Sequence, residues 1–133
     1  MTPLISVALS TYKGARHLPM QLDSLLAQRG VELEIVAVDD GSDDATTEIL
    51  AAYAARDQRL RWSANPGNLG PTKSFERALS LCTGAWLAPC DQDDVWHPDK
   101  LATLQAAIGD HGIGDLYPHD RRGEHAQLLE QGV

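Results

Sequence analysis

The chain has 133 residues, 43% of them hydrophobic, and a formal net charge of −8, so its length fits one domain with a buried core. The acidic balance argues against a nucleic-acid surface, because phosphate backbones attract basic patches. The sequence shows no signal-peptide pattern, no run of roughly 18 apolar residues that could span a membrane, and too few cysteines for a disulfide framework. We therefore expect a cytoplasmic protein, and peripheral association with the inner face of the membrane stays open.

The first half of the chain alternates strand patterns with helical ones. Residues 4–9 are almost continuously apolar, as in a strand that is buried on both faces. Leucines at helical spacing follow, and Gly30 is the expected stop of that helix. Residues 33–38 predict a second strand, and Ser42 and Asp43 are the candidate N-caps of the helix behind it.

The same alternation continues as far as Ile108. Residues 60–64 predict a short strand, residues 65–71 are dense in turn formers, and a third helix follows. A fourth strand runs through Leu87, and Pro98 opens a fourth helix at its first turn. This order predicts an α/β fold, Rossmann-like, with a mainly parallel sheet flanked by helices and joined by right-handed crossovers.

The pattern fades after residue 108. Residues 109–133 hold five of the eleven glycines and three of the five histidines, without sustained periodicity. Residues 114–117 predict a further strand only poorly, because of the glycine and of Pro118 behind them. We expect one domain over residues 1–108 and a weakly patterned tail over residues 109–133, as in a truncated chain with a non-native continuation.

Two of the predicted strands end in aspartates. The second runs into Asp39 and Asp40, and the fourth into Asp91, Asp93 and Asp94. Clustered carboxylates repel one another and are costly to bury unpaired, so they point to an external cation. Mg²⁺ and Mn²⁺ prefer such oxygen ligands, and open α/β sheets bind ligands at strand ends. A solvated acidic turn is the alternative, and two acid-ended strands favour a site.

Four short motifs occur in order within the patterned part of the chain. They are Ile5–Tyr12 (ISVALSTY), Val38–Ser42 (VDDGS), Asn68–Gly70 (NLG) and Asp91–Trp96 (DQDDVW). Together they resemble the nucleotide-sugar-binding half of family 2 glycosyltransferases of the GT-A fold. The segments Lys73–Leu79 and Pro98–Lys100 are most similar to the rhamnosyltransferase-like branch. The resemblance covers residues 4–108, and its motifs are specific as a set although each is weak alone.

The resemblance implies where a nucleoside would bind. Ser10, Thr11 and Tyr12 would lie beside the base and the ribose. Asp39 would accept a hydrogen bond from a base N–H, and Asp40 would support the same turn. Two alternatives stay open, because Tyr12 could be a packing residue and Asp40 a helix cap.

The resemblance also implies a cation site in the Asp-x-Asp motif. Asp91 and Asp93 would approach the ribose and a bridging Mg²⁺ or Mn²⁺, and Asp94 would orient the site. A diphosphate leaving group needs its charge neutralised as the sugar C1–O bond breaks, which a divalent cation does. Lys73 would touch a phosphate, unless it is an ordinary exposed helical lysine, and Trp96 would wall the sugar pocket, unless it packs in the core.

The implied reaction is a metal-dependent, inverting transfer of a sugar from a UDP- or dTDP-sugar to a glycan or lipid-linked acceptor. Its setting would be the synthesis of cell-surface polysaccharide or glycoconjugate. Complete members of the family are longer, and their second half supplies the acceptor pocket and the general base. No segment here matches that half, so no catalytic base is assigned. We expect this form to bind the donor without catalysing transfer, and to self-associate through an exposed sheet edge.

Three other classes compete with this interpretation. A non-catalytic nucleotide- or partner-binding α/β module would carry the same motifs and differ only in activity. A phosphoacceptor signalling domain has its paired acids after the first strand, whereas this strand ends in Ser10–Tyr12. A sugar nucleotidyltransferase needs a glycine-rich basic loop there, and residues 13–16 show little of one.

Overall fold

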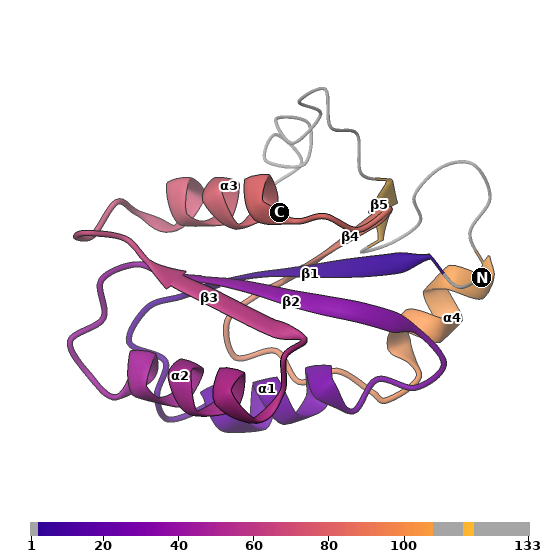
Figure 1. Ribbon diagram of the computed structural model, residues 1–133, viewed down its shortest axis with the longest axis horizontal. Coiled ribbons are helices and arrows are strands. Elements are labelled where there is room, and N and C mark those ends of the chain that lie inside the picture. Colours follow the sequence, from indigo (N-terminus) through magenta and orange to yellow (C-terminus); the bar gives the residue numbers. More distant parts are fainter. Residues whose placement is uncertain (1–2, 108–115, 119–133) are drawn as a thin grey trace.

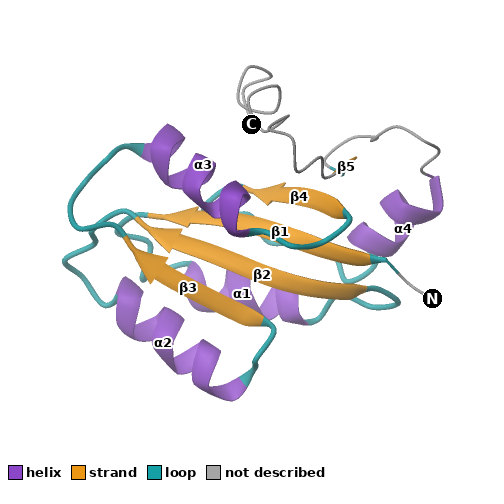
Figure 2. Cartoon of the chain, turned by 45° about the horizontal axis from the view of Figure 1, so that its top comes forward, coloured by secondary structure: helices purple, strands orange, loops and turns teal. Residues whose placement is uncertain are grey.

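The computed structural model describes residues 3–107 and 116–118. In this part of the chain a five-stranded sheet, in the order β3-β2-β1-β4-β5, lies between helices on both faces (Figures 1 and 2). The strands are β1 (Leu4–Thr11), β2 (Glu32–Asp39), β3 (Leu60–Ala64), β4 (Trp86–Cys90) and β5 (Tyr117–Pro118); the helices are α1 (Leu18–Leu26), α2 (Thr46–Arg56), α3 (Pro71–Leu81) and α4 (Lys100–Ala107). The α/β fold that the sequence predicts is confirmed.

The apolar run of β1 serves two cores at once. Ile5, Val7 and Leu9 pack in the core that α1, α2 and α4 cover, whereas Ala8 packs in the core under α3. Side chains alternate across a strand, so a strand with helices on both faces needs apolar residues at odd and even positions alike. Figure 1 shows α1 and α2 on one side of the sheet and α3 on the other.

The strand order places a switch point beside β1. The chain builds outward from β1 to β2 and β3, then returns to the other side of β1 to form β4, and all of these strands are parallel. At this end of the sheet β1 leads into α1 on one face, whereas α3 covers the opposite face before the chain enters β4. In open α/β sheets ligands bind in the crevice at such a switch point.

The start of α2 differs from the prediction. The helix begins at Thr46, with Ala45 at the N-cap position, so Ser42 and Asp43 do not cap it. The Ser42 hydroxyl donates instead to a buried aspartate at the end of β2. The Thr46 N–H is satisfied by the carboxylate of Asp44, two residues before it. The hydrogen bond between Ser42 and the aspartate of β2 thus takes the place of the capping contact that the local sequence favours.

The start of α4 also lies beyond its predicted position. The helix begins at Lys100, so Pro98 lies in the turn before it and not in its first turn. The predicted end at Ile108 lies outside the described residues.

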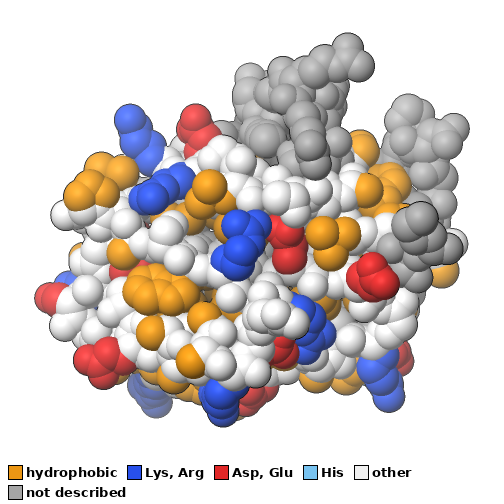
Figure 3. Space-filling model, in the orientation of Figure 1, with side chains coloured by type: hydrophobic (Ala, Val, Ile, Leu, Met, Phe, Trp, Pro, Cys, Tyr) orange, Lys and Arg blue, Asp and Glu red, His pale blue; other side chains and the backbone are white. Residues whose placement is uncertain are grey.

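No helix in the described ranges combines the length and the hydropathy needed to cross a bilayer. On the face drawn in Figure 3, acidic and basic side chains are interspersed.

The poorly predicted strand belongs to the sheet. Tyr117 pairs antiparallel with Leu87, and Pro118 with Trp86. Leu116 is fully buried in one core, while Tyr117 packs against the other. Proline is tolerated here because β5 pairs with β4 along one side only among the described strands. A segment this short carries too little periodicity to be recognised, and the rest of the predicted tail lies outside the described residues.

Candidate functional site

A cavity of about 480 Å³ opens at the carboxyl ends of β1 and β4. The described residues that line it are Ser10, Tyr12, Asp40, Asn68, Pro71, Thr72, Phe75, Cys90, Asp91 and Gln92. Each of the four sequence motifs contributes at least one of them. The fold thus brings four predicted site residues, Ser10, Tyr12, Asp40 and Asp91, to one hollow at the switch point.

Asp39 and Thr11 lie behind the cavity wall. Asp39 is fully buried, and its Oδ1 accepts hydrogen bonds from Thr11 Oγ1 at 2.8 Å and from Ser42 Oγ at 2.7 Å. Its Oδ2 accepts the Ser42 N–H at 2.8 Å. These contacts join the end of β1 to the turn after β2. The carboxylate predicted to meet a base is therefore engaged within the protein, and its neighbour Asp40 lines the cavity.

Asp40 holds the loop that leads into α3. Its side chain is 3% exposed, and its Oδ1 accepts the Leu69 N–H at 2.7 Å and an Asn65 Nδ2 hydrogen at 3.0 Å. Its Oδ2 accepts the Gly70 N–H at 3.0 Å. Burial raises the pKa of Asp40, but these hydrogen bonds outweigh burial and hold that pKa below its usual 3.8. Asp40 therefore supports the loop before α3 and not its own turn.

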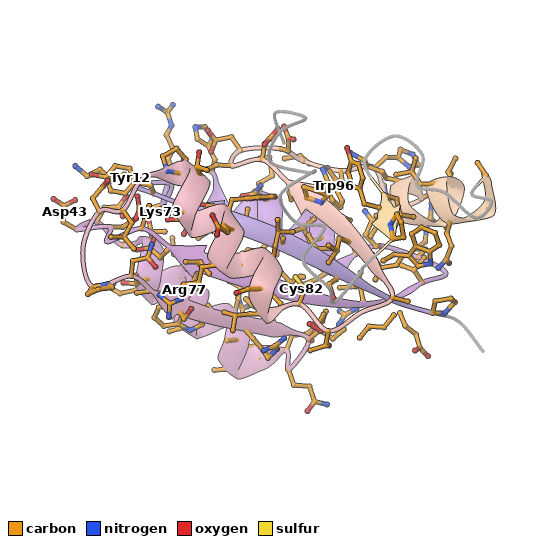
Figure 4. The ribbon with its side chains drawn as sticks, turned by 90° about the horizontal axis from the view of Figure 1, so that it is seen from above. Tyr12, Asp43, Lys73, Arg77, Cys82 and Trp96 are labelled. Atoms are coloured by element: carbon orange, nitrogen blue, oxygen red, sulfur yellow. The ribbon has the colours of Figure 1, made fainter. Side chains whose placement is uncertain are left out.

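Asn65 extends this network to α3. Its Nδ2 also donates to Ser74 Oγ at 2.8 Å, and its Oδ1 accepts from Arg77 Nη1 at 2.7 Å. Arg77 and Lys73 project from α3 in Figure 4. Through Asn65 the Asp40 carboxylate is linked to two side chains of α3, so the first turn of that helix is fixed against the cavity. The sequence pattern marks Asn65 only as a loop former.

The turn after β1 is held by four consecutive backbone N–H groups. Tyr12 donates to Gln92 Oε1, Lys13 to Ser42 Oγ, Gly14 to Thr46 Oγ1 and Ala15 to Asp44 Oδ2. The Tyr12 side chain is 39% exposed and lines the cavity, so it is not a core packing residue. An aromatic ring on a fixed turn offers a face for a planar ligand.

Asp91–Asp94 form a tight turn at the end of β4. The Asp94 N–H donates to the Asp91 carbonyl at 3.1 Å, and Asp93 has a φ of 75°. A positive φ at the third position is typical of a type II turn, and aspartate tolerates it better than most residues. All three aspartates are exposed, and of the three Asp91 is among the described residues that line the cavity.

The donor set suits a cation that is shared with a ligand. In the described ranges, no three His, Cys, Asp or Glu side chains are grouped closely enough to hold a metal ion by themselves. Mg²⁺ is seldom held by an all-protein cage, and one or two carboxylates with substrate phosphates and water are its usual ligands. Asp91, which lines the cavity, supplies a hard oxygen donor of that kind. The residues present therefore fit Mg²⁺ or Mn²⁺ bound together with a diphosphate.

Lys73 and Trp96 are the remaining predicted residues, and Cys90 is a thiol in the cavity lining. Lys73 is exposed on α3 and is not among the described cavity residues, although Figure 4 shows it at the same end of the molecule as Tyr12. Trp96 is 5% exposed in the core, with Lys100 Nζ 4.3 Å from its ring centroid, so it is a packing residue. Burial raises the pKa of Cys90 to about 12, so its thiol is not a nucleophile at neutral pH.

Two side chains of α1 and one just beyond its end support the segment that follows β4. Gln21 Nε2 donates to the Asp91 carbonyl at 2.6 Å, Ser24 Oγ accepts the Trp96 N–H at 3.1 Å, and Gln28 bonds the His97 carbonyl and the Leu101 N–H. No sequence motif singles out these residues. Their signal is polar character at the spacing i, i+3 and i+7, which is that of one helix face, with Gln28 two residues beyond the last helical residue. Gln21 is fully buried, directly beneath the acidic turn.

Comparison with known proteins identifies the family. The sequence model of Glycosyl transferase family 2 matches residues 6–125. The chain belongs to glycosyl transferase family 2. This family 2 chain is 36% identical over 102 residues to the succinoglycan biosynthesis protein ExoO of Rhizobium meliloti (strain 1021), which covers 77% of this chain and 29% of that protein. It is 33% identical over 115 residues to a PGL/p-HBAD biosynthesis glycosyltransferase of Mycobacterium bovis (strain BCG / Pasteur 1173P2), over 86% of this chain and 45% of that protein.

Solved structures show the same arrangement. S. aureus TarS 1-349 in complex with UDP superposes with a TM-score of 0.74 at 32% identity, over 84% of this family 2 chain and 33% of that one. Mannosyltransferase PcManGT from Pyrobaculum calidifontis, in complex with GDP-Man and Mn²⁺, gives a TM-score of 0.77 at 26% identity, over 86% and 34%. The Rossmann-like GT-A arrangement is confirmed. The chain spans less than half the length of these relatives and structures.

Proposed function

We propose that this chain is the donor-binding part of a family 2 glycosyltransferase. Its β1–β4 cavity would hold the nucleoside diphosphate of a UDP- or dTDP-sugar together with a divalent cation. The whole enzyme would transfer the sugar, with inversion, to a glycan or lipid-linked acceptor in cell-surface polysaccharide or glycoconjugate synthesis. The observation that carries the proposal is an acid-lined cavity at the switch point of the sheet.

The charge of the cavity supports a cation in the complex. Its described lining includes Asp40 and Asp91 and no lysine, arginine or histidine. A diphosphate placed beside two carboxylates would be repelled unless a positive ion lay between them. Lys13, the basic residue next to Tyr12, is exposed and pairs with Asp43 at 3.7 Å. That basic side chain is thus paired with an acidic partner on the surface.

Three residues of the cavity have distinct parts in this proposal. The Tyr12 ring would stack on the base or ribose, and Asp40 keeps the first turn of α3 in place as the opposite wall. Asp91 would hold the cation on its carboxylate. When bound, the cation would neutralise the diphosphate as it leaves the sugar. No described residue is assigned as the general base.

The structurally similar proteins support a nucleotide-sugar donor but do not identify its nucleotide base. The S. aureus TarS 1-349 structures include complexes with UDP and with UDP-GlcNAc, whereas the PcManGT complex holds GDP-Man and Mn²⁺. Their ligands share a nucleoside diphosphate and differ in its base. We therefore infer the diphosphate and cation from the chemistry of the cavity, and leave the base to a binding panel.

Calorimetric titration of the purified chain tests the proposal. We expect UDP or dTDP to bind in the presence of Mn²⁺ and to bind much more weakly in EDTA. Asp91→Asn should lower the affinity in Mn²⁺ at least about tenfold, because the cation loses a carboxylate ligand. Asp43→Asn is the matched control, since it removes the same charge from an exposed residue that does not line the cavity. Absence of binding by the folded wild-type chain at millimolar nucleotide would refute the proposal.

The alternative of a non-catalytic binding module requires a second measurement. Release of free nucleoside diphosphate from a panel of sugar donors, with Mn²⁺ and with EDTA, separates transfer or hydrolysis from binding. Binding without turnover by this chain, together with turnover by a longer relative, would assign donor binding to this segment. Binding without turnover by both would favour the module.

A further inference from the structure

Gln92 occupies the corner of the acidic turn. Gln92 is the second position of this turn, between Asp91 and the positive-φ residue Asp93. The Gln92 side chain is half-buried and lines the cavity beside Asp91. The resemblance assigns roles to the acids of this motif and leaves Gln92 without one.

Gln92 joins the acidic turn to the turn that carries Tyr12. Its Oε1 accepts the Tyr12 N–H at 2.6 Å, across 80 positions of sequence. The next three N–H groups of that turn donate to side chains of the β2–α2 loop and of the first residue of α2. Of these four side-chain acceptors in the described ranges, Gln92 is thus the one that comes from the β4 side of the switch point. It connects the two strand ends that flank the switch point.

Gly14 leaves the space that Gln92 occupies. A Cβ added at Gly14 would lie 3.0 Å from Gln92 Cδ and 3.1 Å from Gln92 Oε1, and the three nearest atoms all belong to Gln92. The φ of Gly14 is not in the left-handed region, so an alanine is acceptable to the backbone itself. Close approach of the glutamine, and not chain geometry, is what calls for glycine here.

The chemistry of residue 92 suits this connection. A carboxamide accepts an N–H as a carboxylate does, yet it adds no charge beside Asp91, Asp93 and Asp94. A fourth carboxylate would raise the repulsion within the turn. The neutral residue in the middle of an acidic motif therefore has a use of its own, distinct from that of the acids.

We propose that Gln92, seated against Gly14, is a positioning residue that fixes the distance between the Tyr12 turn and Asp91. A nucleoside diphosphate with its cation would span both turns, so the pairing keeps the base site and the cation site in register before the ligand arrives. This inference rests on the proposed function. Gln92 touches neither the cation nor the reacting atoms in this role; it acts through Tyr12 and Asp91.

The first experiment measures how strongly the cation helps the nucleotide. The dissociation constant of UDP is determined in EDTA and in Mn²⁺, and the ratio of the two is the cation's contribution. We expect Gln92→Ala to lower this ratio about fivefold or more while the constant in EDTA changes less than about twofold. Gln58→Ala, at an exposed glutamine in the turn before β3, is the matched control. A merely structural role would weaken both constants together, and that result or an unchanged ratio would overturn the proposal.

A second experiment needs no ligand. Amide hydrogen exchange followed by NMR should show the Tyr12 amide exchanging about fivefold faster or more in Gln92→Ala, while the amides of Lys13 and Gly14 change less. Gly14→Ala should act on the Tyr12 amide in the same direction, because the new methyl displaces the glutamine. In the Gln92→Ala background Gly14→Ala should have no further effect.

These two experiments separate the possible failures. Unchanged Tyr12 exchange in both single variants, or additive effects in the double variant, would overturn the positioning role. Absence of UDP binding by the wild-type chain would overturn the proposed function and with it the coupling, whatever the exchange shows. Gly14→Ala serves as the independent variant if Gln92→Ala does not fold, because it leaves the glutamine present and moves only its end.

Discussion

Asp39 and Asp40 are adjacent in the sequence, and their carboxylates have opposite surroundings. Asp39 ends β2 and turns inward to Thr11 and Ser42, while Asp40 turns toward the loop before α3 and the cavity. Successive residues of an extended chain point to opposite sides, which fits the opposite directions of these two carboxylates at the end of β2. The sequence shows the pair, and the tertiary structure decides which member lines the cavity.

The lowered pKa of Asp40 predicts a pH-dependent contribution to stability. The carboxylate accepts two backbone N–H groups, and an asparagine would leave one of them unpaired, so Asp40→Asn should lower the free energy of unfolding by about 1–3 kcal/mol at pH 7. The native pKa lies below the unfolded value of about 3.9, so the wild-type advantage is complete above that pH and shrinks as the pH falls through the native pKa. Urea unfolding at pH 7, 5 and 3 measures the difference.

The control for this prediction is Asp43→Asn. Asp43 is exposed, and its ion pair with Lys13 spans 3.7 Å, so its substitution should cost less than about 1 kcal/mol. A difference between wild type and Asp40→Asn that stays constant from pH 7 to pH 3 would contradict the assigned hydrogen-bonding role.

At the scale of elements, β4 carries the acidic turn and must lie close against β1. Gly84 permits this approach two residues before β4 begins: a Cβ there would lie 2.6 Å from the Leu4 carbonyl oxygen and 2.7 Å from Ser6 Oγ. The Gly84 N–H donates to that Ser6 hydroxyl at 2.7 Å. The constraint comes from the neighbouring strand, and the sequence around Gly84 shows only an ordinary turn residue.

Gly84→Ala should therefore destabilise the sheet. The backbone of β1 cannot rotate away as a flexible side chain would, so we expect the free energy of unfolding to fall by about 1–3 kcal/mol. Gly67→Ala is the matched control, because nothing lies within 4 Å of a Cβ added at Gly67 and its φ is ordinary. That variant should be neutral or more stable by about 0.4–1 kcal/mol. Equal losses in both, measured by urea unfolding, would show that strand contact is not the cause.

At the scale of the whole molecule, the sheet includes residues beyond the regular strand–helix alternation. Leu116 is fully buried in the core that α1, α2 and α4 cover, and Tyr117 continues the sheet beside β4. In the described ranges β5 pairs with β4 at Trp86 and Leu87. Self-association through a sheet edge stays a prediction, as does the division of the chain at residue 108.

Leu116→Ala tests whether this segment contributes to the folded state. Truncation of a fully buried leucine should lower the free energy of unfolding by about 2–5 kcal/mol. Leu81→Ala, at a leucine that is 40% exposed at the end of α3, should lower it by much less. Chemical denaturation of the two variants beside the wild type gives the comparison. A loss at Leu116 no greater than that at Leu81 would mean that β5 does not stabilise the domain in solution.

Periodicity made most of the architecture predictable. Apolar runs such as residues 4–9 and 33–38, alternating with leucines at helical spacing, report burial directly, because a strand and a helix expose their faces at different periods. The predicted start of α2 was wrong by a few residues because it depends on a contact that is not periodic. Ser42 has the chemistry of a cap, but its hydroxyl donates to Asp39 instead. Side-chain hydrogen bonds across the fold leave no periodic trace.

The sequence by itself determined the α/β order and the motifs at the strand ends, because parallel strands carry their loops to one edge of the sheet. Only the tertiary structure decided which residues of those motifs share the cavity. It placed Asp40 and Asp91 there, set Asp39 behind the wall, and paired Gln92 with Tyr12 across 80 positions. The physical reason is that contact between distant segments depends on the direction in which each side chain leaves its turn, and that direction is fixed by hydrogen bonds between loops that no local pattern encodes.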